Sequence, residues 1–201
     1  TAIGNTALTA NTTGAYNTAI RQNALAANTT GSASVAIGTF ALQNSTTGSN
    51  SAVGYNALAT CTTCGSNAAF GNSALATLSN GQDNTAFGNS SQQLGTTAGS
   101  NASFGYASLL TNKTGTNNTA LGNDSMRYLN NATSSVAIGS GALAGVSGDL
   151  ATNYNNVAIG YRAGYIMGTG ANNNTLIGYQ AGNALTTGAN NIVLGYDIDA
   201  P

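Results

Sequence analysis

Few residues of this chain have side chains that could carry out chemistry. Cys61 and Cys64 form a Cys-Thr-Thr-Cys sequence, a spacing that occurs in redox pairs and in halves of zinc sites. A structural zinc site needs four ligands, and the chain has no histidine and no second cysteine pair. We therefore interpret this segment as a turn, closed by a local disulfide if the compartment is oxidising.

The carboxylates and serines offer no clearer sign of catalysis. Asp197 and Asp199 are the only close pair of acidic residues, and no serine has an evident base partner. We interpret the two carboxylates as solvated and expect no enzyme activity, no cofactor and no metal site. With four basic residues among 201, the chain has no basic stripe for nucleic acid. It also has no run of about 18 apolar residues, so no membrane insertion is expected.

A short repeat covers the chain and must position all of these residues. Each unit reads approximately Asn-Thr-Ala-Ile-Gly, then x-x-Ala-Leu and a Thr-Thr-Gly turn, with a period of about 17 residues. We number each unit from the glycine that follows the aliphatic residue, which is position 0. A period this short leaves room for one coil of a solenoid. Position 0 is occupied by Gly4, Gly38, Gly54, Gly71, Gly88, Gly105, Gly122, Gly139, Gly160, Gly178 and Gly195, with Arg21 standing in once.

The repeat predicts an all-β fold, a single parallel β-solenoid domain over residues 1–201. We expect about twelve coils of about 17 residues with two short strands each. Stacked at about 4.8 Å, they would form a rod of about 55–60 Å. The unit between Gly139 and Gly160 is four residues longer, which predicts a surface loop within residues 145–155. Because the sequence starts within a repeat, we expect it to belong to a longer fibre protein.

The columns of the repeat suggest which residues are buried. Position −1 is always large and apolar, as at Ile37, Phe70 and Ile138, so we expect it to line the core together with the leucine at position +4. Positions −2 and +3 are mostly alanine, which favours close packing against an opposite wall or another chain. The asparagine at position −4 is expected to form a ladder between coils.

The turns give two further expectations. A second glycine about ten residues after the first predicts a second reversal with positive φ. Arg21, which replaces a glycine of the first column, should be strained or should mark a different turn.

Two sets of surface residues are candidate sites. Tyrosines recur at position +1, three of them in consecutive coils, and could equally form a binding stripe or pack at a turn; they are Tyr55, Tyr106, Tyr161, Tyr179 and Tyr196. Asn-x-Ser/Thr sequons near turns are candidate glycosylation sites that we expect to be exposed; they include Asn11, Asn28, Asn44, Asn101 and Asn112.

The segments Ser34–Gly38, Ser135–Gly139 and Asn156–Gly160 resemble the repeat of YadA-like heads of trimeric autotransporter adhesins. The Thr-Thr-Gly turns also resemble repeat shafts of phage tail fibres and bacterial surface fibre proteins. The resemblance implies a left-handed β-roll, three chains about one axis and an extracellular location on a cell surface or virion. Coils of 17 residues are longer than is common in the adhesin family.

The sequence thus favours a non-enzymatic structural or adhesive module, a homotrimer or filament that binds a carbohydrate or host surface through its Asn/Thr/Tyr exterior. An ice-binding solenoid is the alternative, because threonine pairs recur in register, as at Thr12–Thr13 and Thr29–Thr30. Adjacent threonines point to opposite faces of a strand, which favours ordinary turn chemistry. Measurement of thermal hysteresis would separate the two functions.

Overall fold

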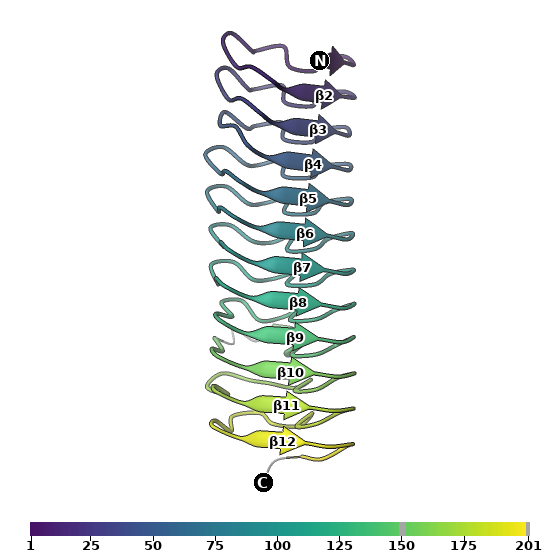
Figure 1. Cartoon of the computed structure of the whole chain (residues 1–201), viewed down its shortest axis with the longest axis vertical. Coiled ribbons are helices and arrows are strands. Elements are labelled where there is room, and N and C mark those ends of the chain that lie inside the picture. The colour runs from purple at the N-terminus through teal and green to yellow at the C-terminus, as the bar shows by residue number, and fades with distance from the viewer. Residues whose placement is uncertain (149–151, 200–201) are drawn as a thin grey trace.

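The chain forms a straight rod of stacked coils (Figure 1). The structure is a computed structural model and describes residues 1–148 and 152–199. Each coil contributes one short strand, and the strands form one parallel sheet in chain order. The strands are β1 (Ala2–Ile3), β2 (Thr18–Ile20), β3 (Val35–Ile37), β4 (Ser51–Val53), β5 (Ala68–Phe70), β6 (Thr85–Phe87), β7 (Ala102–Phe104), β8 (Thr119–Leu121), β9 (Val136–Ile138), β10 (Val157–Ile159), β11 (Thr175–Ile177) and β12 (Ile192–Leu194).

The predicted parallel β-solenoid is therefore confirmed. Equivalent residues of successive coils pair directly, for example Ala36 with Ala52 and Ile37 with Val53. In Figure 1 the strands run from left to right in front, and the chain returns behind them as it descends, which is a left-handed winding. The expectation of two strands per coil is wrong, because the described part of each coil holds a single named strand.

Single left-handed residues bend the rest of the coil, in place of a second strand. In the coil of Gly54, the residues at positions −5, +2 and +4 are Ser49, Asn56 and Leu58, with φ of 64°, 58° and 51°. The second glycine column is not the source of this conformation, since Gly48 and Gly65 lack a positive φ. Our expectation for that column was therefore wrong at these two glycines, although Gly148 and Gly170 of the same column do have a positive φ, of 85° and 94°. Arg21 has a φ of 95°, which confirms that it is strained.

Position 0 needs glycine for two reasons. Gly71 has a φ of 142°, and a Cβ there would lie 2.3 Å from the carbonyl oxygen of Gly88 in the next coil. The backbones of successive coils thus approach too closely at Gly71 to leave room for a Cβ. The corner recurs in nearly every coil and fixes how tightly the coils stack.

The interior is lined by the alanine columns, which corrects our assignment of the core. In each complete strand the middle residue, at position −2, is buried, whereas its neighbours face outward, as in the pattern of β3. Ile37 at position −1 is 37% exposed, and Phe70 and Ile138 are only half-buried. The alternation of faces along the strand was predicted correctly, but the buried face is the opposite one.

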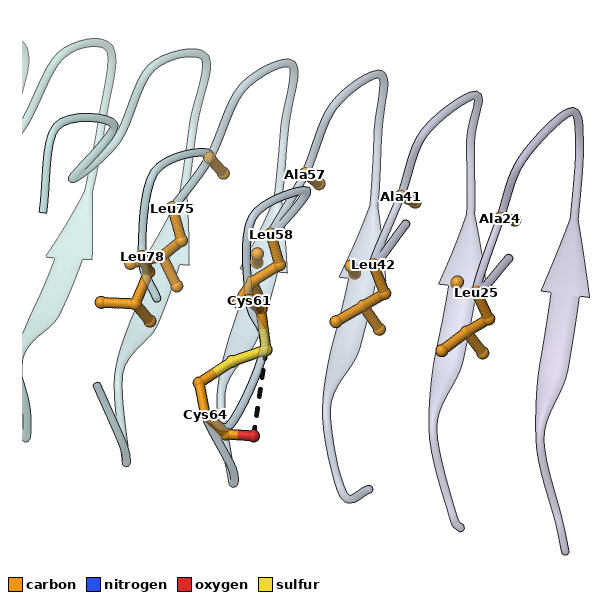
Figure 2. Close-up of a cluster of buried hydrophobic side chains, with 14 of the residues drawn as sticks. Ala24, Leu25, Ala41, Leu42, Ala57, Leu58, Cys61, Cys64, Leu75 and Leu78 are labelled. Carbon is orange, nitrogen blue, oxygen red and sulfur yellow. Dashed lines mark hydrogen bonds between the residues drawn. A yellow bond between two sulfur atoms is a disulfide. The ribbon is translucent and has the colours of Figure 1, made fainter. Parts of the chain in front are cut away.

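The leucine at position +4 fills the space behind the sheet, as expected. Leu25, Leu42, Leu58 and Leu75 are fully buried, and Figure 2 shows them at the same place in successive coils. Their left-handed backbone costs about 1–2 kcal/mol per residue. Burial of a leucine side chain contributes about 1.5–3 kcal/mol, which offsets that strain.

The interior of each coil has a fixed width, which is divided between the side chains of the sheet at position −2 and those of the opposite wall at position +4. Position −2 holds the larger Leu176 in β11, and the residues opposite are then Gly164 and Gly182 rather than leucine. A Cβ on either glycine would lie 2.8 Å from a methyl carbon of Leu176. A large residue on one wall therefore requires a minimal one on the other.

The asparagines at position −4 form the predicted ladder. Oδ1 of Asn67 accepts hydrogen bonds from the backbone N–H and from Nδ2 of Asn84, at 3.0 and 3.1 Å. Nδ2 of Asn67 in turn donates to the carbonyl oxygen of Gly81, at 3.0 Å. Asn101, which we had named only as a sequon, continues the same ladder from Asn84.

The longer coil is described only in part. Val146 and Gly148 are exposed and lie outside any strand, in agreement with a surface loop, while Asn153 is buried. Residues 149–151 of the predicted loop lie outside the described residues.

The glycine corner gives a first test. Substitution Gly71→Ala should lower the free energy of unfolding by at least about 2 kcal/mol, because it adds a steric overlap to a disfavoured φ. Gly65→Ala is the matched control, since a Cβ there would lie 3.9 Å from its nearest neighbour and the φ is ordinary; a change within about 0.5 kcal/mol is expected. Urea unfolding measures both, and equal effects would contradict the assignment.

The ladder gives a second test. Substitution Asn84→Ala removes the acceptor for the backbone N–H and side chain of Asn101. Each buried group left unsatisfied costs about 1–3 kcal/mol, so we expect a loss of at least about 2 kcal/mol. Asn89→Ala, at an exposed site, should change stability by less than about 0.5 kcal/mol. A neutral Asn84→Ala variant in thermal unfolding would show that the ladder does not hold the coils together.

Candidate functional site

The outer face of the sheet is the largest candidate surface. The apolar residues at position −1 follow one another from β1 to β12, and Phe87, Phe104 and Leu121 are 37%, 38% and 48% exposed. Phe70, Phe87 and Phe104 stack with ring centroids 4.5 and 5.1 Å apart and planes within 7°. We call this column the apolar stripe; it consists of Ile3, Ile20, Ile37, Val53, Phe70, Phe87, Phe104, Leu121, Ile138, Ile159, Ile177 and Leu194.

The tyrosines at position +1 lie beside this face and are all exposed. Tyr161, Tyr179 and Tyr196 stack in consecutive coils at 5.3 and 4.9 Å, as predicted. Tyr55 instead meets Phe40 edge to face, at 5.8 Å, and Tyr106 has no described ring partner. The structure therefore brings three of the five predicted residues together and separates the other two.

The two cysteines are joined in a disulfide, and both are fully buried. They occupy positions +7 and +10, where another coil has Asn28 and Gly31. There, Nδ2 of Asn28 donates to the carbonyl oxygen of Gly31, at 3.0 Å. The disulfide therefore closes covalently a turn that hydrogen bonds close elsewhere (Figure 2).

The predicted sequons differ in exposure. Asn44 is exposed and Asn11 is half-buried, but Asn28, Asn101 and Asn112 are buried. Our expectation that all five are exposed was wrong for the last three, because their amides bond to the backbone inside the turns and the ladder. Asn44 remains the candidate whose side chain the fold leaves accessible, because Nδ2 of the half-buried Asn11 also donates to the backbone of its turn, at the carbonyl oxygen of Gly14 (3.0 Å).

A polar layer crosses the interior near the middle of the rod. The hydroxyl oxygen of Ser91 lies 2.7 Å from that of Ser103 and 3.0 Å from that of Ser108. Gln92 donates from Nε2 to Asn84 at 3.1 Å, while its buried Oε1 has no partner among the described residues. The layer separates two apolar clusters, one up to Ala86 and the other from Leu109 onward.

The polar layer holds no titratable residue, so its hydroxyls have no base. Within residues 1–148 and 152–199, no three His, Cys, Asp or Glu side chains come close enough to hold a metal ion. Over the same residues, no helix has the length and apolar character needed to cross a membrane.

Comparisons with known proteins give no match: no family model, no curated protein and no solved structure matches this chain significantly.

The polar layer gives a third test. Substitution Gln92→Leu restores the residue found at this position in neighbouring coils, such as Leu75 and Leu109. It removes an unpartnered buried oxygen, so the free energy of unfolding should rise by about 1–2 kcal/mol. The reverse substitution, Leu75→Gln, should lower it by about 2–5 kcal/mol. Denaturant unfolding checks both signs, and a destabilised Gln92→Leu variant would contradict this account.

Proposed function

We propose that the chain is a non-enzymatic structural and adhesive module of an extracellular fibre, in which three copies associate along the apolar stripe. The observation that carries the proposal is the continuity of the stripe. Large apolar residues occupy the same outward position in every coil. A sheet face that stays in contact with water would normally carry polar residues there. Exposed apolar patches of this extent mark interaction sites.

The chemistry of the face favours a second copy of the chain as its occupant. None of the four basic and five acidic residues lies at position −1 or −3, so no charge has to be desolvated there. A partner with the same repeat presents its side chains at the same spacing, so every coil can meet an equivalent coil. Association would also cover Phe70, Phe87 and Phe104, which the single chain leaves partly in water.

The number of copies and the location rest on other grounds. Three chains about one axis follow from the resemblance to YadA-like heads. The disulfide between Cys61 and Cys64 supports an oxidising, extracellular compartment, either a cell surface or a virion. A surface adhesin and a tail-fibre shaft both fit, with the Asn/Thr/Tyr exterior available to a carbohydrate or another host ligand.

The ice-binding alternative has less support. Thr12, Thr29 and Thr46 are exposed in successive coils, as an ice-binding face would require. However, Oγ1 of Thr12 donates to the carbonyl oxygen of Thr29 at 3.0 Å, and Oγ1 of Thr46 donates to that of Thr62 at 2.9 Å. Because these hydroxyls donate their hydrogen bonds to the neighbouring coil, fewer donors are left to bind the water molecules of an ice lattice.

The proposal is tested by the native mass in solution. We expect three times the chain mass of 19.7 kDa, and we expect the double variant Phe87→Asp/Phe104→Asp to be monomeric, because association would bury unpaired charges. Leu94→Asp is the matched control: Leu94 is 40% exposed and occupies position +6 of its coil, outside the stripe. Light scattering measures all three proteins. A single-chain mass for the unmodified protein, or dissociation by Leu94→Asp, would contradict the proposal.

A further inference from the structure

We propose that a small hollow on the C-terminal half of the rod binds the carboxylate of an acidic sugar, such as a uronic acid. The hollow has a volume of about 140 Å³ and spans three consecutive coils. Its lining includes Asp124, Arg127, Tyr128, Tyr161, Arg162 and Tyr165. This size suits one small ring rather than a drug-sized ligand.

The charge of the hollow is unusual for this chain. Two of only four basic residues, Arg127 and Arg162, line it together with one acidic residue, Asp124. The hollow therefore carries a formal charge of +1 on a chain whose net charge is −1. This charge favours an anionic ligand.

The guanidinium of Arg162 is held in place with free donors that such a ligand could bind. Its guanidinium carbon lies 5.3 Å from the ring centroid of Tyr161 and 4.7 Å from that of Tyr165. The guanidinium is thus held by two aromatic rings, while no described residue forms an ion pair or hydrogen bond with its N–H groups. A planar fork of free donors matches a carboxylate, which can accept two parallel hydrogen bonds.

Arg127 and Asp124 supply the complementary polar groups. Nη1 of Arg127 donates to Oδ1 of Asp124 at 2.9 Å, and its guanidinium carbon lies 4.9 Å from the ring centroid of Tyr128. The buried Nε of Arg127 has no partner among the described residues. Oδ2 of Asp124 likewise has no described hydrogen bond, so it can accept one from a sugar hydroxyl.

The tyrosines favour a sugar over a simple anion. Tyr128, Tyr161 and Tyr165 line the hollow. Where the arginines and Tyr179 leave these rings uncovered, apolar ring edges lie beside hydroxyl groups, a combination that fits a sugar with its C–H faces and hydroxyl rim. An inorganic phosphate would use the charge of Arg162 but not these rings. Asp124 would also repel a doubly charged phosphate more strongly than a single carboxylate.

This inference deepens the adhesive part of the proposed function by naming a ligand class. It rests on three coils of one chain, so it does not depend on association through the apolar stripe. Native mass and ligand binding can therefore fail independently of each other.

The experiment is a titration of the protein in its native state with D-glucuronate, D-glucose and inorganic phosphate, followed by NMR. We expect glucuronate to bind at least about tenfold more tightly than glucose, because the two sugars differ only in the carboxylate that meets Arg162. Arg162→Gln should abolish this preference. Glutamine is accepted at this position, since Gln180 occupies it in the next coil with a φ of 51°.

Arg21→Gln is the matched control, because it removes an exposed arginine at the opposite end of the rod and should leave binding unchanged. Arg162→Lys keeps the charge but loses the planar fork, so most of the preference should disappear. Equal binding of glucose and glucuronate, equal binding of phosphate, or unchanged glucuronate binding by Arg162→Gln would each overturn the proposal.

Discussion

The close approach of successive backbones at position 0 is the constraint on which the rest of the molecule depends. At Gly71 and its equivalents the next coil leaves no room for a Cβ, so the coils stack tightly and the interior stays narrow. The chain closes each coil with isolated left-handed residues rather than with a second strand. The interior then accommodates one leucine per coil from one wall and little more than a methyl group from the other.

This narrow interior determines the outer surface. Since the strand's inward position can hold only a small side chain, the large apolar residues beside it must face outward. A sheet face lined with Ile, Phe and Leu is costly for an isolated chain in water. The same constraint that makes each coil thin therefore also gives the rod a surface suited to association. The proposal of a fibre rests on this packing and not on any catalytic residue.

Much of the architecture could be predicted from the sequence, because the repeat period implies a solenoid and the asparagine column implies a ladder. The tyrosine stack and the strain at Arg21 followed from position alone. The buried face could not be predicted, because a period of two places positions −1 and −3 on one side without saying which side is inside. The sequence did contain one signal of the buried face: where position −2 carries the larger Leu176, position +4 carries Gly164 and Gly182 in place of leucine. Only two walls that pack against each other need such compensation. The hollow that we propose binds a sugar had no signal in the sequence, because its residues come from three coils and share no motif.

Distance measurement between spin labels tests the central claim, that position −1 faces outward and is covered by another copy. With a nitroxide label attached to every chain of the Phe87→Cys variant, pulsed electron paramagnetic resonance on the native particle should measure short distances between the labels of different chains. The same label at Thr97→Cys, on an exposed turn, should give longer ones. Longer distances from position 87 than from position 97, or no distance between chains at either position, would contradict the account.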